Sequence, residues 1–158
     1  MYRIIFLLFL IPFAGNAQLR LPKFFTDNML LQRNKPIHLW GGGLPGHTVS
    51  ASFAGSEGSA RVNADSTWSI YLKQHQANST PQTLKLVSGN DSIVLKNILV
   101  GDLWLCIGQS NMEWPMEREA HFASEIASAR QPLLRFYNPV YAGKHIFGTA
   151  FTDSVTQK

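Results

Sequence analysis

Ser110 stands where a short apolar run of the sequence gives way to polar side chains. The run covers residues 103–107 and stops at Gly108, after which Gln109, Ser110 and Asn111 follow one another. An apolar run of this length bounded by glycine indicates a strand buried on both faces, and in open α/β sheets ligands bind at the carboxyl ends of such strands. The pattern therefore predicts that Ser110 lies at the end of a strand with its hydroxyl directed to a surface.

The chemistry expected of Ser110 follows from what a hydroxyl lacks. A serine attacks an ester only when a base takes its proton and when donors are already in place for the oxyanion that forms. The backbone N–H of Ser110 is the natural first donor, because it lies at a strand-to-helix turn. Gly108 permits a tight turn, and Gln109 and Asn111 are interpreted as shaping it. The expected reaction is acyl transfer through an acyl-enzyme.

The run from Gly101 to Trp114 resembles the first motif block of the sialate O-acetylesterases, a branch of the SGNH hydrolases. It reads G-D-L-W-L-C-I-G-Q-S-N-M-E-W. In that family the serine of G-Q-S-N-M is the nucleophile, which assigns this role to Ser110. The resemblance implies a secreted carbohydrate O-acetylesterase that acts on an acetylated sugar or sialic acid without a cofactor. Its remaining oxyanion donors, a glycine and an asparagine, come from later motif blocks.

The catalytic base that the resemblance implies is not found in the sequence. SGNH hydrolases carry it in a D-x-x-H element, and no aspartate here has a histidine three positions later: Asp27, Asp65, Asp91, Asp102 and Asp153. His121 and His145 follow Ser110, and both are interpreted as structural or solvent-exposed. We therefore expect the N-terminal portion only of such an enzyme, truncated and with little or no esterase activity of its own.

Residues 18–98 alternate short β-prone segments with turn-forming clusters, which predicts a small antiparallel β-sandwich. Trp40 and Trp68 are interpreted as core residues. Short runs in this region resemble the β domain that precedes the hydrolase domain of sialate O-acetylesterases, among them residues 28–32 and 39–41. The predicted strands cover 37–40, 49–53, 60–63, 68–72, 83–88 and 92–95.

An alternative function belongs to this β-rich region. In this alternative, the chain is a non-catalytic carbohydrate-binding or adhesion β-sandwich with a vestigial hydrolase start. Exposed Trp and Tyr side chains can stack on sugar rings.

Residues 99–158 are expected to begin an α/β hydrolase domain of the SGNH or flavodoxin-like type. A strand at 103–107, a helix at 117–130 and a strand at 133–137 form the opening unit of a parallel sheet. One or two strands cannot cover both faces of a sheet. Partial exposure is therefore expected for Leu103, Leu105, Ile107, Leu133 and Leu134, unless the β-rich region packs over them.

The first 17 residues have the pattern of an export signal. Arg3 precedes an apolar segment at 4–13, and small residues at 15–17 predict cleavage before Gln18. The mature protein is expected to be secreted or periplasmic and not stably associated with the membrane. An uncleaved anchor is the alternative, although the apolar segment falls short of the roughly 20 residues that span a bilayer.

Cysteine and charge exclude several classes of site. Cys106 is the only cysteine, so the chain has no internal disulfide, and its place in an apolar run predicts a buried, inert thiol. No His, Cys, Asp and Glu spacing resembles a metal site. The net charge of +4 is spread along the chain without a basic run, so nucleic-acid binding is not expected.

Overall fold

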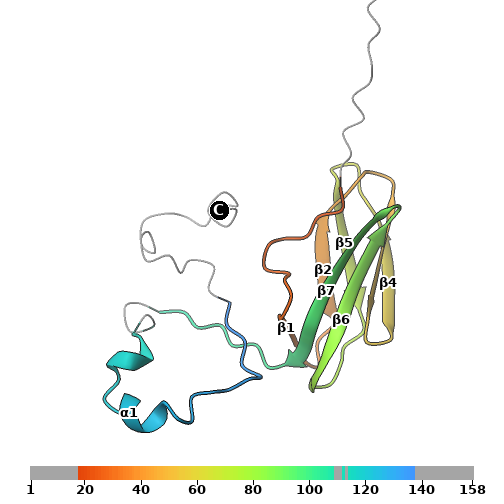
Figure 1. The fold of residues 1–158 in the computed structure, drawn as a ribbon. Coiled ribbons are helices and arrows are strands. Elements are labelled where there is room, and N and C mark those ends of the chain that lie inside the picture. Colours follow the sequence, from red (N-terminus) through yellow and green to blue (C-terminus); the bar gives the residue numbers. More distant parts are fainter. Residues whose placement is uncertain (1–17, 109–111, 113, 138–158) are drawn as a thin grey trace, which may run out of the picture.

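A computed structural model describes residues 18–108, 112 and 114–137 (Figure 1). Strands occupy most of residues 30–101, and short helical turns and loops follow them. The strands are β1 (Leu30–Gln32), β2 (Ile37–Gly42), β3 (Thr48–Phe53), β4 (Ser56–Arg61), β5 (Thr67–Leu72), β6 (Asn78–Ser88) and β7 (Asp91–Gly101). After them come the 3₁₀ turn η2 (Met116–Arg118) and the helix α1 (Phe122–Glu125).

The strands form a five-stranded sheet in the order β1-β7-β6-β3-β4 and a two-stranded sheet of β2 and β5. The pair β1 and β7 is parallel, and the other pairs are antiparallel. The long hairpin of β6 and β7 lies between β1 and β3 in the five-stranded sheet, and the chain leaves the strands from the end of β7 (Figure 1). This exit leads directly into the Ser110 motif.

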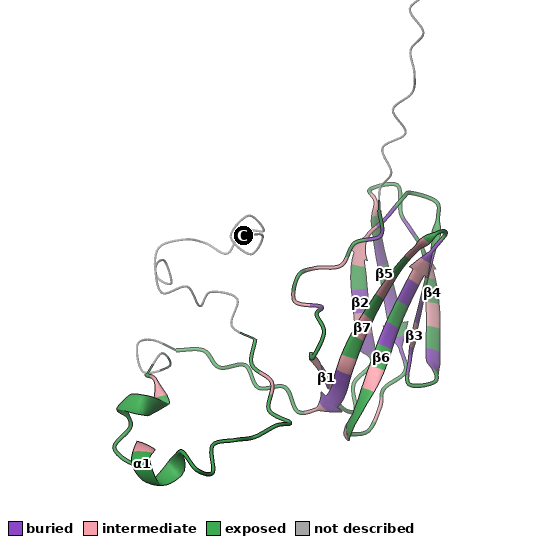
Figure 2. Ribbon diagram, in the orientation of Figure 1, coloured by how far each residue is buried: buried purple, intermediate pink, exposed green. Residues whose placement is uncertain are grey.

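Side-chain alternation places the core between the two sheets. Along β5 the buried positions Trp68, Ile70 and Leu72 alternate with exposed ones, as a half-buried strand requires. Phe53 and Leu84 from the five-stranded sheet belong to the same buried cluster. Each fully buried side chain of this size contributes about 1.5–3 kcal/mol relative to an exposed one. Figure 2 shows the buried residues gathered in the strands and the exposed ones along the segment after residue 101.

The mostly β character expected of this region is confirmed, but several details differ. β6 begins at Asn78, before the predicted 83–88, and β7 runs to Gly101, past the predicted 92–95. β1 was not predicted, and β4 begins at Ser56, inside a predicted turn. The expectation that Trp40 is a core residue is wrong, because its side chain is 38% exposed, whereas Trp68 is 1% exposed. The reason is alternation: Ile37 and Leu39 point inward along β2, so Trp40 falls on the outer face.

The segment after residue 101 differs more strongly from expectation. Residues 103–107 and 133–137 are not strands, and the helix predicted at 117–130 is reduced to η2 and α1. Cys106 was expected to be buried and is exposed. A strand buried on both faces needs neighbours on each side, and the described residues place none beside this segment. The predicted exposure is confirmed for Leu103, Leu105, Ile107, Leu133 and Leu134, at 57%, 84%, 76%, 56% and 55%.

Within the described ranges, no helix has both the length and the apolar character needed to cross a membrane.

Candidate functional site

The predicted nucleophile Ser110 lies outside the described residues, together with Gln109 and Asn111. Gly108 is described, and a Cβ added to it would collide with the side chain of Met112. A side chain at position 108 would therefore require the Met112 side chain to move.

The segment that leads to Ser110 begins at the end of β7, which pairs with β1. Leu30, Leu31 and Gln32 lie opposite Leu99, Val100 and Gly101 in parallel register. The N–H of Arg33 donates to the carbonyl oxygen of Gly101 at 2.8 Å, which extends the pairing beyond β1. The chain is therefore held on one side as it leaves the sheet.

Two side chains extend this contact past the end of β7. The N–H of Leu103 donates to Oε1 of Gln32 at 2.8 Å, and Nε of Arg33 donates to Oδ1 of Asp102 at 2.8 Å. The side chains of Arg33 and Asp102 are 45% and 48% exposed, so this ion pair is screened by solvent. We call Gln32, Arg33, Asp102 and Leu103 the exit clamp.

A second contact joins the strands to the later segment. Nδ2 of Asn97 donates to Oδ1 of Asn28 at 2.6 Å, and Nη2 of Arg135 donates to Oδ1 of Asn97 at 3.4 Å. Both asparagines have positive φ, 65° for Asn28 and 56° for Asn97, a conformation that asparagine tolerates better than most residues. This side-chain network connects the loop before β1, an irregular point of β7 and the segment after α1.

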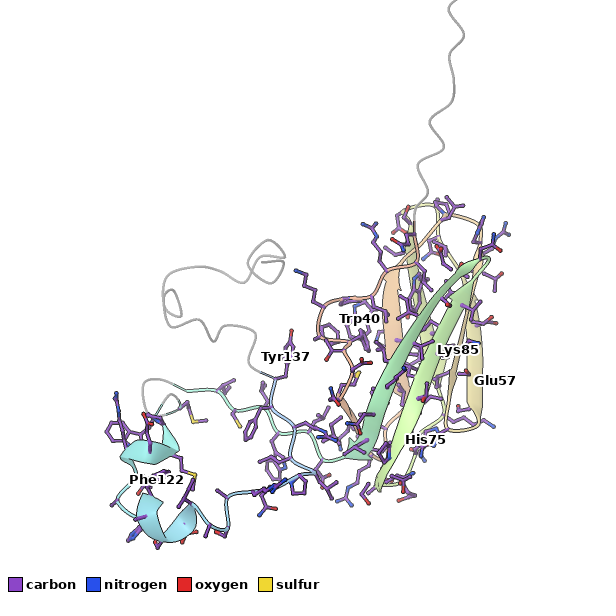
Figure 3. All side chains as sticks on the ribbon, viewed as in Figure 1. Trp40, Glu57, His75, Lys85, Phe122 and Tyr137 are labelled. Carbon is purple, nitrogen blue, oxygen red and sulfur yellow. The ribbon has the colours of Figure 1, made fainter. Side chains whose placement is uncertain are left out.

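His121 and His145 are the two histidines that follow Ser110 in the sequence. His121 is exposed at the start of α1, and Figure 3 shows Phe122, the next residue, on that helix, well away from the sheets. His145 lies outside the described residues. Among the described residues, no group of three His, Cys, Asp or Glu side chains is arranged to hold a metal ion.

An aromatic surface covers the outer face of β2 and β5. The rings of His38 and Tyr71 stack at 4.2 Å with an angle of 3° between them, and His38 also stacks on Trp40 at 4.6 Å. Nε2 of His38 and Oγ of Ser69 lie 2.8 Å apart, in hydrogen-bond contact. Tyr71 is 65% exposed, although one ring face meets His38. We call Tyr71, His38 and Trp40 the aromatic row; Figure 3 labels Trp40 on the side of the sheets where Tyr137 also lies.

The outer face of β3, β4 and β6 carries a shallow polar depression of about 430 Å³. Three serines line it, together with Glu57 and Lys85, which Figure 3 labels beside the sheet. None of the groups with chemistry expected from the sequence lies there.

Sequence reasoning missed the exit clamp. Gln32 belongs to the run 28–32 that was noted for its family resemblance, but nothing local in that run shows that it pairs with residues about 70 positions later. The resemblance itself was the available signal, since a matching run far from the serine motif needs a structural reason.

Comparison with known proteins places the chain beside carbohydrate esterases. It is 31% identical over 107 residues to a sialate O-acetylesterase from Homo sapiens, covering 60% of this chain and 20% of that protein. A sialate O-acetylesterase from Mus musculus is 25% identical over 114 residues, covering 65% of this chain and 21% of that protein. The chain thus spans about a fifth of the length of the curated relatives that it matches.

A solved structure gives the same result at the level of the fold. A carbohydrate acetylesterase from Xanthomonas citri superposes with a TM-score of 0.67 at 31% identity, covering 72% of this chain and 26% of that one. No protein-family model matches the chain. The relatives and the solved structure confirm the resemblance that the Ser110 motif indicated, and their partial coverage fits an N-terminal portion.

Proposed function

We propose that this chain, whose resemblance to the sialate O-acetylesterase family is confirmed over the portion that it covers, supplies the serine nucleophile of a carbohydrate O-acetylesterase. The observation that carries the proposal is the likeness to the Xanthomonas citri carbohydrate acetylesterase, in fold and sequence together, over 72% of this chain. The match to sialate O-acetylesterases supports the same reaction class. The proposed substrate is an acetyl ester of a sugar or of sialic acid.

In the proposed reaction the Ser110 hydroxyl attacks the acetyl carbonyl carbon while a base takes its proton. The N–H of Ser110 donates to the oxyanion, and Gly108, Gln109 and Asn111 shape the turn that presents both groups. The bond from the acetyl carbon to the sugar oxygen breaks, and the sugar hydroxyl leaves with the proton. Water then hydrolyses the acetyl-serine. The base and the remaining oxyanion donors are proposed to lie outside these 158 residues, so the chain alone is expected to be inactive.

The proposed organisation is an exported β-sandwich at 18–98 followed by the start of an α/β hydrolase domain at 99–158. Cleavage before Gln18 is supported by the position of Leu19. This residue is 4% exposed, and its N–H donates to Oδ2 of Asp91 at 3.0 Å. Leu19, which is buried and hydrogen-bonded, thus directly follows Gln18, the proposed N-terminus after cleavage.

The test is a chimeric enzyme that replaces the matching segment of the Xanthomonas citri enzyme with residues 18–137. We expect the chimera to hydrolyse p-nitrophenyl acetate, and Ser110→Ala to lower kcat by at least about 10³-fold, as loss of a nucleophile does in serine hydrolases. Ser128→Ala, at an exposed serine of the same segment, is the matched control and should keep the activity. A folded chimera whose activity survives Ser110→Ala would refute the assignment.

The 158-residue chain gives the complementary result. It should hydrolyse p-nitrophenyl acetate no faster than its own Ser110→Ala variant, because a serine without base and full oxyanion hole lacks most of the catalytic machinery. Robust hydrolysis that depends on Ser110 would show that the chain holds its own base.

The aromatic row favours a second candidate function, a sugar-binding module. One ring face of Tyr71 is taken by His38, while the residue remains 65% exposed and leaves ring surface on which an apolar sugar face can stack. Tyr71→Ala should weaken binding of acetylated sugars about 5- to 10-fold, and Tyr137→Ala, at another exposed tyrosine, should not. NMR titration measures both affinities. No saturable shift at the aromatic row would exclude this candidate.

A further inference from the structure

We propose that Gln32 and Arg33 are positioning residues, which fix the register of the serine-bearing segment as it leaves β7. The inference rests on the proposed function, because register matters here only if Ser110 must reach a defined place. It concerns the exit clamp, whose four residues come from two parts of the sequence about 70 positions apart.

Gln32 fixes a single backbone group. Its Oε1 accepts the N–H of Leu103 at 2.8 Å, and its Nε2 donates to the carbonyl oxygen of Arg33 at 3.3 Å. The side-chain amide is thus held at both ends and copies the next ladder bond that a longer β1 would have made. Leu103 is the first residue of the apolar run at 103–107 that leads to the Ser110 motif, so the bond fixes that run at its beginning.

Arg33 holds the two residues that precede Leu103 by one contact to each. Its N–H donates to the carbonyl oxygen of Gly101, and its Nε donates to Oδ1 of Asp102, both at 2.8 Å. Backbone and side chain of Arg33 therefore hold consecutive residues of the exit. Because side chains alternate between faces, a slip by one residue would replace Asp102 with Leu103, which cannot accept this hydrogen bond.

The clamp is the last fixed point before the nucleophile among the described residues. Trp104, Leu105 and Ile107 are 86%, 84% and 76% exposed, and residues 104–107 make no hydrogen bond to the sheets in the described part of the chain. A one-residue slip moves a strand by about 3.3 Å and exchanges its two faces. In the proposed enzyme the register at Leu103 sets the point from which the chain runs to Ser110, and a displacement of about 1 Å at a reacting group can lower a catalytic rate about 10²-fold.

The proposed role differs from a contribution to global stability. The Arg33 and Asp102 side chains are about half exposed, and ion pairs of this kind add little to folding. Breaking the clamp should leave the unfolding midpoint of the strands unchanged and should loosen only the exit.

Hydrogen exchange of the 158-residue chain tests the clamp at Leu103. Gln32→Leu should speed exchange of the Leu103 amide about 2- to 10-fold, the range expected for one lost hydrogen bond. Gln32→Glu keeps an acceptor and should retain protection. Gln82→Leu is the matched control, because the side chain of Gln82 donates to the nearby Thr80 carbonyl oxygen on β6 and not to the exit segment. Unchanged exchange at Leu103 in Gln32→Leu would overturn the role of Gln32.

A charge exchange tests Arg33. Arg33→Asp and Asp102→Arg should each speed exchange of the Leu103 amide, which follows the ion pair directly, and the double variant should restore its protection. Arg61→Ala, which removes an exposed arginine bonded to the Gly46 carbonyl oxygen, serves as the control. Failure of the double variant to restore protection would contradict the ion-pair role.

Distances between spin labels report register directly. With labels at positions 83 and 104 in a Cys106→Ser background, Gln32→Leu and Arg33→Ala should broaden the distance distribution, whereas Arg61→Ala should not. An unchanged distribution would refute the positioning role. Hydrogen exchange and spin-label distances do not need esterase activity. If the clamp variants change both but the folded chimera is inactive, the proposed function alone is refuted. If the chimera is active but the clamp variants change neither, this inference alone is refuted.

Discussion

Trp68 and Trp104 lie in two segments that were both predicted as strands, and they reach opposite environments. Trp68 is 1% exposed, and its Nε1 donates to the carbonyl oxygen of Gly42 at 2.9 Å, whereas Trp104 is 86% exposed. The difference lies in their neighbours: β5 has β2 beside it and the five-stranded sheet against its inner face, and the described residues put no strand beside Trp104. An apolar run thus becomes a buried strand only where other strands complete it.

The same contrast holds between the strand region and the segment that carries the proposed nucleophile. The strands of residues 30–101 complete their own core, while the segment with the proposed nucleophile is fixed at its first residues by the exit clamp and by the Asn97 contact with Arg135. The proposed reaction therefore depends on the part of the chain that is least complete by itself.

Limited trypsin digestion should show the largest difference between the two regions. Arg118 and Arg130 lie in the exposed segment, whereas Arg61 and Lys85 lie within paired strands. Cleavage at the first pair should be at least about 100-fold faster, because sites within a folded unit are cut only when it opens. Mass spectrometry of the early fragments measures the order. Equal rates at both pairs would mean that the strands are not a stable unit.

Truncating the two tryptophans sharpens the comparison energetically. Trp68→Ala should lower the free energy of unfolding by about 3–5 kcal/mol through cavity formation, and Trp104→Ala should change it by less than about 0.5 kcal/mol. Urea unfolding followed by circular dichroism gives both values. A large loss in Trp104→Ala would reveal packing around the exit segment.

Gly41 tests how tightly the strand frame is packed. A Cβ at Gly41 would collide with the carbonyl oxygen of Arg20 and lie 2.9 Å from the Trp68 ring, whereas the nearest atom to a Cβ at Gly42 is 3.5 Å away. Gly41→Ala should therefore cost about 1–3 kcal/mol, the usual price of overpacking. Gly42→Ala, one residue along β2, is the control with ordinary contacts. Equal midpoints in thermal unfolding would contradict the packing described here.

Acid should have the smallest effect, and it should act at the turn before β5. The hydroxyl and the N–H of Thr67 donate to Oδ1 of Asp65 at 2.7 and 3.0 Å, which holds the pKa of this carboxyl below its ordinary value of 3.8. A carboxyl whose pKa is lower in the folded chain stabilises the fold at pH values above its pKa in the unfolded chain. This stabilisation disappears as the pH falls through the pKa of the folded chain. Asp65→Asn should flatten this acid dependence of the melting temperature. An unchanged acid slope would exclude Asp65 as its source.

Local periodicity predicted much of the strand region, but it did not predict which distant segments pair. β5 was predicted as the β-prone segment 68–72, and alternation of side chains, had it been applied along β2, would have placed Trp40 outside. β1 has three residues and pairs with residues about 70 positions later, so its own sequence carries little signal. Burial of Cys106 was expected because the run around it is apolar, yet burial depends on strands outside the run. The motif predicted the role of Ser110, whereas the exit clamp depends on residues about 70 positions apart that only the fold brings together.

Trapping of the acyl-enzyme tests the central claim most directly. The chimera is mixed with p-nitrophenyl acetate, quenched with acid in the burst phase and digested for mass spectrometry. We predict one acetyl group on the peptide that contains Ser110, and none on that peptide in Ser110→Ala. An active chimera that carries its acetyl group on another residue, or that forms none, would contradict the claim that Ser110 is the nucleophile of a carbohydrate O-acetylesterase.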